Sequence, residues 1–354
     1  MLAEVLRLRS KSFQVIAFFI LVVGVEGASA RPLDPISGDE LSARISALTH
    51  EPWNGRASDG GRAPANCKEI KVTMDVIDPQ LREKREVAVS LFRPASSAKV
   101  PAVIVVPTMN GVTVVEPKIA SQLCSNGIAA VIADVVDTSL PREMPGSGHE
   151  DAVNRRAILA LRTLLDLLSN HPAIDRDRLG MIGSSLGGIV TSMMVGVEPE
   201  RIKAAVIAVG AGNLPFVLST SDNSNVSELR RQRMEHLKLA NSEAYEDWLR
   251  PIVKFDPMFF TPRAVKDRIM MVTAKADTKV PYEMQRALHE AFGRPTVSEY
   301  SGGHIETILS MTYFYFGEIV NFYKSRFGMS AFYVPPVTVH PPLTPEERAS
   351  LGIR

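Results

Sequence analysis

The sequence predicts an α/β fold in which a mostly parallel sheet of eight strands carries helices on both faces and a helical cap insertion. Three observations support this prediction. Apolar runs of strand length alternate with segments of helical periodicity from Lys68 to Phe327. Some runs, such as Val100–Val106, are apolar throughout, which is typical of strands covered on both faces. One connection, residues 211–265, is too long for a simple crossover between strands.

The composition indicates a globular protein with a large core. The chain has 354 residues, of which 45% are hydrophobic and 22% are charged. The formal net charge of +1 gives no electrostatic reason to expect nucleic-acid binding.

Residues 1–30 have the pattern of a cleavable signal peptide. A basic start precedes an apolar run from Phe13 to Val23, and Ala28-Ser29-Ala30 supplies the small residues of a cleavage site. The apolar run is too short to span a bilayer comfortably, so we expect no membrane span after cleavage. The sequence therefore predicts export, to the periplasm or the medium.

The segment before the core is expected to be largely extended. Residues 31–66 are polar and rich in Pro, Gly and Ala, and only Asp39 to Leu48 has a helical pattern. Apolar and polar residues then alternate over Glu69–Val76 and again over Val87–Phe92, with a turn at Asp78-Pro79 between them. This pattern predicts an antiparallel hairpin at one edge of the sheet.

The core is expected in two parts, residues 67–210 and 266–330, with the cap between them. The tail, residues 331–354, holds five prolines and is expected to be an irregular surface segment. After the hairpin, strands are expected at 100–106, 128–133, 179–182, 204–209, 269–272 and 296–300, with core helices at 116–125, 151–168, 282–292 and 305–327 and cap helices at 226–239 and 242–249.

A Gly-x-Ser-x-Gly pattern marks the candidate nucleophile. Gly183-Ser184-Ser185-Leu186-Gly187 lies between a strand and a segment that can be helical, and a serine at such a corner has a strained backbone. Side chains two residues before and after it would collide, so both places need glycine. Only Ser185 meets this requirement, because Ser184 has Ile182 and Leu186 at those places.

A serine hydroxyl needs a histidine to take its proton and a carboxylate to orient that histidine. Asp277 follows the strand that ends at Val272, and His304 follows the strand that ends at Tyr300. The carboxyl ends of parallel strands share one edge of a sheet, so these side chains are expected beside Ser185. The order Ser-Asp-His is the one typical of Gly-x-Ser-x-Gly hydrolases.

Other residues compete for the roles of acid and base. Asp134 and Asp137 follow an earlier strand, and His149 lies in a loop but precedes the serine, which breaks the expected order. Asp277 taken alone is also typical of a turn or helix cap, and His304 after two glycines is compatible with a plain loop residue.

The substrate oxyanion needs two backbone donors. We expect one to be the N–H of Leu186 and the other to be that of Met109, in the loop after Val106. Aromatic residues of the cap, Phe216, Phe259 and Phe260, predict an apolar pocket, although they are equally compatible with the cap's own core.

The cysteines Cys67 and Cys124 leave two interpretations open. In an exported protein they can pair, whereas Cys124 in a helical segment is equally typical of a small buried side chain. Their spacing does not indicate a metal site.

From about residue 85 to residue 327 the chain resembles the α/β-hydrolase superfamily, most closely its dienelactone-hydrolase and acyl-esterase branch. The elbow at 183–188, the loop from Asp277 to Pro281 and Gly303-His304 carry the resemblance, with the lead-in at 171–178. Many relatives have His-Gly where this chain has Pro107-Thr108. The resemblance implies a serine hydrolase acting on a small ester through an acyl-enzyme, with no metal or cofactor and with a lid formed by the cap.

Two other functions remain open at this point. A prolyl-oligopeptidase-type peptidase shares this catalytic domain, but residues 31–67 are far too short for the propeller that such enzymes usually carry. A non-catalytic binding protein on the same fold is the second, and an intact triad argues against it. Neither the particular ester nor the oligomeric state follows from the sequence.

Overall fold

The computed structural model describes residues 30–48, 55–59, 66–78, 82–136, 149–329 and 338–353. The predicted signal peptide, residues 1–30, lies outside the described residues except for Ala30. The chain from Arg31 onward forms one compact unit. None of the helices in the described ranges combines the length and apolarity that crossing a bilayer requires.

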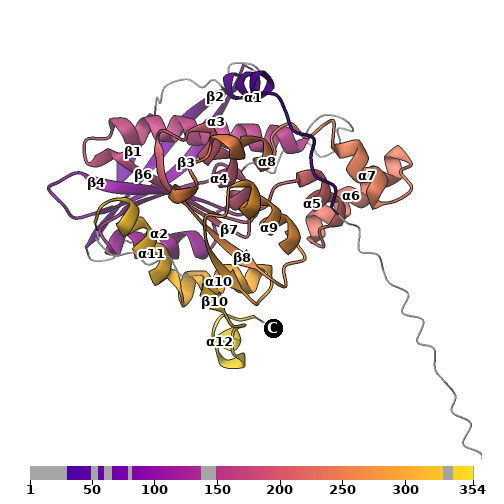
Figure 1. Ribbon diagram of the computed structural model, residues 1–354. Coiled ribbons are helices and arrows are strands. Elements are labelled where there is room, and N and C mark those ends of the chain that lie inside the picture. The colour runs from indigo at the N-terminus through magenta and orange to yellow at the C-terminus, as the bar shows by residue number, and fades with distance from the viewer. Residues whose placement is uncertain are drawn as a thin grey trace, which may run out of the picture. The chain divides into compact units, whose positions relative to one another are not determined.

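The described strands form one sheet in the order β1-β2-β3-β5-β4-β6-β7-β8-β9-β10 (Figure 1). Pairing is antiparallel from β1 to β5 and parallel from β5 to β10. The strands are β1 (Gly55–Asp59), β2 (Cys67–Asp78), β3 (Glu83–Pro94), β4 (Val100–Val106), β5 (Ala129–Ala133), β6 (Ile174–Ser184), β7 (Ile202–Ala208), β8 (Ile269–Ala274), β9 (Thr296–Tyr300) and β10 (Thr338–His340).

All eight predicted strands are present, but the predicted number is too low, because two edge strands extend the sheet. β1 has the sequence Gly-Arg-Ala-Ser-Asp, which carries no apolar alternation, and it pairs with β2 inside the expected lead-in. β10 is only three residues long and pairs with β9. The described part of the tail is therefore ordered rather than irregular, and it continues into helix α12 (Pro345–Ser350).

Helices cover both faces of the sheet, as predicted (Figure 1). Alternate residues of a buried strand face opposite layers, so Ile104 packs with one layer and Val103 and Val105 with the other. The first layer contains α3 (His149–Asn170), α4 (Leu186–Val197) and α9 (Tyr282–Ala291), and the second contains α2 (Val115–Ser125), α10 (His304–Tyr313) and α11 (Phe316–Arg326).

The segment between β7 and β8 is helical. Its last part belongs to the core rather than to a separate cap, because α8 packs so closely on α4 that a side chain at Gly196 would lie 2.2 Å from the Phe260 carbonyl oxygen. The elements are α5 (Leu214–Thr220), α6 (Ser224–Leu237), α7 (Ser242–Leu249), α8 (Pro257–Phe260) and two short 3-10 turns, Thr261–Arg263 and Lys266–Arg268.

The N-terminal lead-in is tied to this helical segment. Its described residues include the helix α1 (Gly38–Ser46), and the residues before α1 run toward α5 and α7 (Figure 1). The Arg31 carbonyl accepts hydrogen bonds from the side chains of Asn213 (2.9 Å) and Arg250 (2.8 Å). The lead-in therefore holds α5 and α7 together from outside.

Cys67 and Cys124 form a disulfide bond, which decides between the two interpretations of these cysteines. The bond joins β2 to α2 across a separation of 57 residues. Cys124 is fully buried, so the bond fixes the antiparallel edge of the sheet to the helix layer beneath it. Closing a loop of this length restricts the unfolded chain and stabilises the folded one.

We predict that replacing both cysteines by serine lowers the free energy of unfolding by about 2–4 kcal/mol, because the unfolded chain regains loop entropy. Urea unfolding of the variant and of the oxidised protein measures this difference. Reduction of the unaltered protein is the matched control and should give a similar loss. Equal stability of all three forms would contradict the prediction.

Candidate active site

Ser185 lies at the sharp corner between β6 and α4, with φ 58° and ψ −122°. A side chain at Gly183 would place its Cβ 2.1 Å from the Gly187 carbonyl oxygen, and one at Gly187 would place it 2.3 Å from that of Val106. Neither position can carry a side chain. The Ser185 N–H donates to the Ala208 carbonyl (2.9 Å), which fixes the corner to β7. The collisions expected from the sequence are therefore present.

The structure brings the predicted nucleophile, base and acid together. His304 Nε2 lies 2.9 Å from Ser185 Oγ, and His304 Nδ1 lies 2.7 Å from Asp277 Oδ2. His304 and Asp277 are buried, while Ser185 lines a pocket. Asp277 follows β8, and His304 begins α10 after β9, so adjacent parallel strands deliver both groups to one edge of the sheet. This arrangement can move a proton from Ser185 to His304.

Gln285 holds the carboxylate of Asp277 and was not anticipated from the sequence. Its Nε2 donates to Asp277 Oδ2 (2.9 Å) and to the Val280 carbonyl (2.7 Å), while its Oε1 accepts from Ala274 N–H (3.1 Å). The N–H groups of Lys279 and Val280 donate to Asp277 Oδ1, each at 2.9 Å. Asp277 thus has a fixed orientation. Gln285 lies inside a helical pattern, where no local signal distinguishes it from any other polar residue.

Of the competing residues, Asp134 is described in full, and it does not join this group. Asp134 is exposed after β5, where its carboxyl lies near the position of a side chain at Gly111. Asp137 and the side chain of His149 lie outside the described residues. Within the described ranges, no cluster of three or more His, Cys, Asp or Glu side chains is arranged to hold a metal ion.

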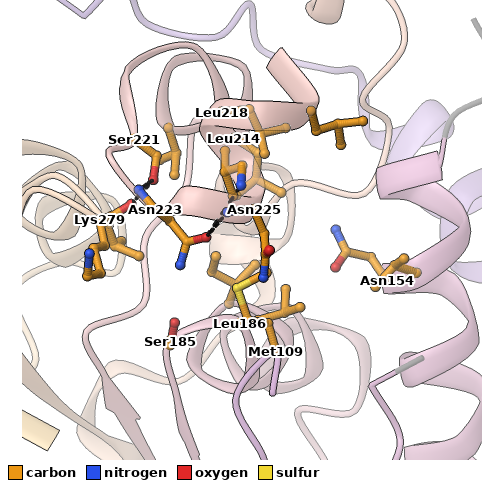
Figure 2. A pocket seen from close by; sticks show the side chains of 16 residues that line it. Met109, Asn154, Ser185, Leu186, Leu214, Leu218, Ser221, Asn223, Asn225 and Lys279 are labelled. Atoms are coloured by element: carbon orange, nitrogen blue, oxygen red, sulfur yellow. Dashed lines mark hydrogen bonds between the residues drawn. The ribbon is translucent and has the colours of Figure 1, made fainter. Parts of the chain in front are cut away.

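Leu186 and Met109 both lie beside Ser185 (Figure 2). Leu186 is the first residue of α4, and the first N–H groups of a helix have no partner within it. Met109 lies in a turn closed by a hydrogen bond from Gly111 N–H to the Thr108 carbonyl (3.1 Å). Their positions are compatible with an oxyanion site, and their role as donors stays a prediction.

The sequence and the structure are both similar to those of known proteins. Residues 161–297 match the model of the prolyl oligopeptidase family. That segment contains Ser185 and Asp277 and ends before His304. The structure is similar to an acetyl xylan esterase from Paenibacillus sp. R4, with a TM-score of 0.60 and 17% identity over 77% of this chain and 91% of that one.

The chain has the α/β-hydrolase fold. Two curated proteins are each 26% identical to parts of this chain. A probable 2-oxo-3-(5-oxofuran-2-ylidene)propanoate lactonase of Bradyrhizobium sp. matches 45% of this chain. Acylamino-acid-releasing enzyme 2 of Oryza sativa subsp. japonica matches 43%. The matches span 63% and 21% of those relatives, less than two thirds of either.

The protein has a largely apolar pocket above Ser185 (Figure 2). Its walls come from the loop after β4, the start of α3, the start of α4, helices α5 and α6, and the loop that carries the acid. The lining side chains are Met109, Val153, Asn154, Ser185, Leu186, Ile189, Leu214, Val217, Leu218, Ser221, Asn223, Asn225, Val226, Leu229, Lys279 and Val280.

The prediction that Phe216, Phe259 and Phe260 line this pocket is wrong. Helical periodicity puts Leu214, Val217 and Leu218 on the pocket side of α5, so Phe216 points away and is buried. Phe260 is fully buried against α4, and Phe259 packs under the Arg44 guanidinium. Phe216 and Phe260 are therefore core residues, and Phe259 is a partly buried residue packed against the core.

The helical segment is fastened to the loop that carries Asp277. Ser221 Oγ donates to the Lys279 carbonyl (2.6 Å), Asp222 N–H donates to the Thr278 carbonyl (3.2 Å), and Thr278 Oγ1 donates to Asp222 Oδ2 (2.6 Å). The Thr278 hydroxyl, aided by the Lys279 charge, lowers the pKa of Asp222. The loop between α5 and α6, which lines the pocket, is therefore hydrogen-bonded to the loop that carries Asp277.

A second buried carboxylate, Asp256, positions α5 and α8. It is fully buried and accepts from the N–H groups of Asn213 (3.0 Å), Leu214 (2.5 Å) and Met258 (2.9 Å). These bonds cap the first turns of both helices. Burial raises the pKa of Asp256 to about 6, against the opposing effect of these N–H groups and the Arg44 charge.

We predict that Asp256 makes stability fall as the pH rises from about 4 to about 6, because in this window the native state keeps a proton that the unfolded state has released. The loss is about 3 kcal/mol in total, and the contribution is constant above this window. Urea unfolding of the unaltered protein and of Asp256→Asn at several pH values isolates the effect as the difference between them. The free energy of unfolding of the unaltered protein minus that of Asp256→Asn should fall over this window. A value that stays constant or rises with pH would contradict the prediction.

Proposed function

We propose that this α/β-hydrolase is an exported serine hydrolase that cleaves a small carboxylic ester through an acyl-enzyme. The observation that carries the proposal is the chain of hydrogen bonds from Ser185 through His304 to Asp277 at the base of an apolar pocket. A hydrogen-bonded Ser-His-Asp group activates a hydroxyl for attack on a carbonyl carbon.

In the proposed mechanism, Ser185 Oγ attacks the ester carbonyl while His304 Nε2 takes its proton. Asp277 stabilises the imidazolium that forms, and the N–H groups of Leu186 and Met109 bind the oxyanion. His304 then gives its proton to the leaving alcohol, which leaves the acyl group on Ser185. A water molecule, deprotonated by His304, attacks this acyl-enzyme and releases the acid. No metal or cofactor takes part in these steps.

The comparisons support hydrolysis of an ester in a general way. The Bradyrhizobium sp. relative is described as a probable lactonase, and a lactone is a cyclic ester. The pocket has room for one substituent of an ester, either its acyl or its alcohol part, which we call the substrate arm. It has few polar groups with which to bind a long peptide. The disulfide bond supports export, because such bonds persist in oxidising compartments.

A peptidase of the prolyl-oligopeptidase type is the second candidate. The match of residues 161–297 to that family and the similarity to an acylamino-acid-releasing enzyme favour it. Amide hydrolysis would use the same three residues. The two candidates therefore differ only in whether the protein cleaves esters or amides faster.

We predict that Ser185→Ala lowers kcat/KM for nitrophenyl esters at least about 10⁴-fold, because the nucleophile is lost. A fluorophosphonate should add its mass to the peptide that contains Ser185. The neighbouring Ser184→Ala variant is the matched control and should still be labelled. Ester hydrolysis at the original rate by Ser185→Ala would refute the mechanism, and faster cleavage of peptide amides than of esters would favour the peptidase.

A further inference from the structure

Asn154 lies in the first turns of α3, with 2% of its surface exposed, and lines the pocket above Ser185. Figure 2 shows its amide directed into the pocket, across from Ser221 and Lys279. A buried amide normally uses both its donor and its acceptor. How these two groups are used therefore bears on what the pocket binds.

The orientation of the Asn154 amide is set by residues 254–255. Its Nδ2 donates to the Phe255 carbonyl oxygen (3.1 Å), while Asp151, one turn earlier, accepts from the N–H groups of Lys254 (2.8 Å) and Phe255 (2.9 Å). A flipped amide would place oxygen against the Phe255 carbonyl, which is repulsive. The bond to Phe255 therefore identifies which amide atom is the oxygen, and Figure 2 shows that oxygen on the pocket side of Asn154.

This oxygen, Asn154 Oδ1, is buried and has no hydrogen-bond partner among the described residues. Leaving a buried acceptor unpaired costs about 1–3 kcal/mol. Much of the nearby lining is apolar, including Val153, Ile189 and Leu218, and cannot supply a donor. Within the described part of the chain, this acceptor is therefore left for a donor that enters the pocket.

Three polar side chains on the opposite wall, Ser221, Asn223 and Lys279, already have partners. Ser221 Oγ donates to the Lys279 carbonyl (2.6 Å), and Asn223 Oδ1 accepts from the N–H of Asn225 (3.0 Å; Figure 2). Lys279 Nζ lies 3.4 Å from Asp222. Their bonds stabilise the loop before α6 and its first turn. Asn154 differs from them because its Oδ1 accepts no hydrogen bond from any described residue.

We infer that Asn154 accepts a hydrogen bond from the substrate, and that the substrate arm in this pocket is a largely apolar chain bearing a hydroxyl or amide N–H donor. This inference rests on the proposed ester hydrolysis and defines its substrate class. An apolar surround strengthens a hydrogen bond, and an arm without the donor leaves the acceptor unpaired. Selectivity thus comes from one acceptor in an apolar wall.

Matched ester pairs test the inference. In each pair a methyl group replaces the donor hydrogen, so that a terminal hydroxyl is compared with its methyl ether, or an amide N–H with its N-methyl amide. One series carries these ends on the acid of nitrophenyl esters, and a second carries them on the alcohol of acetate esters. We expect kcat/KM of the unaltered protein to favour the donor by roughly tenfold in at least one pair.

Asn154→Leu keeps the size of the side chain and removes the acceptor, so the preference within that pair should fall close to one. Asn225→Leu is the matched control, because Asn225 lines the same pocket but is exposed, and this variant should keep the preference. Thermal unfolding of both variants checks that they fold, and the comparison on the unaltered protein requires no variant.

If the unaltered protein hydrolyses the methylated and unmethylated esters of every pair at equal rates, the inference is overturned and the proposed function stands. A preference that survives in Asn154→Leu would overturn it as well, because another group would then accept the hydrogen bond from the substrate. Cleavage of no ester in either series would instead overturn the proposed function and, with it, this inference.

Discussion

The site depends on how closely three backbone segments approach each other around Ser185. The corner from β6 to α4 leaves no space for a side chain at Gly183 or Gly187, and the end of β4 at Val106 closes it from the other side. The absence of side chains at both glycines lets these segments approach, and Ser185 lies between them at a positive φ that a free chain would rarely adopt. The hydroxyl is raised above the sheet edge as a result, and the first turn of α4 begins directly beneath the pocket.

The triad and the elbow were predictable because they follow from topology. In a parallel sheet the carboxyl ends of all strands lie at one edge, so residues 119 positions apart, such as Ser185 and His304, converge without any local signal of contact. Glycine spacing identifies Ser185, and strand ends identify Asp277 and His304. Uniformly apolar strands predict cover on both faces, which the two helix layers provide.

Other features were not predictable, for reasons that lie in packing. The short polar strand β1 and the three-residue β10 depend on their neighbours in the sheet rather than on their own periodicity. The pocket was wrongly assigned to Phe260, because an aromatic residue in an insertion gives no sign of which wall it faces. Asn154 and Gln285 acquire their roles only from the direction of a single amide group, which the folded structure alone determines.

The most direct test of this account is a crystal structure of the protein after reaction with a fluorophosphonate. The account predicts phosphorus bonded to Ser185 Oγ, with the phosphoryl oxygen at hydrogen-bond distance from the N–H groups of both Leu186 and Met109. His304 should remain paired with Asp277. A phosphoryl oxygen directed into solvent, away from both amides, or a label on any other residue would contradict it.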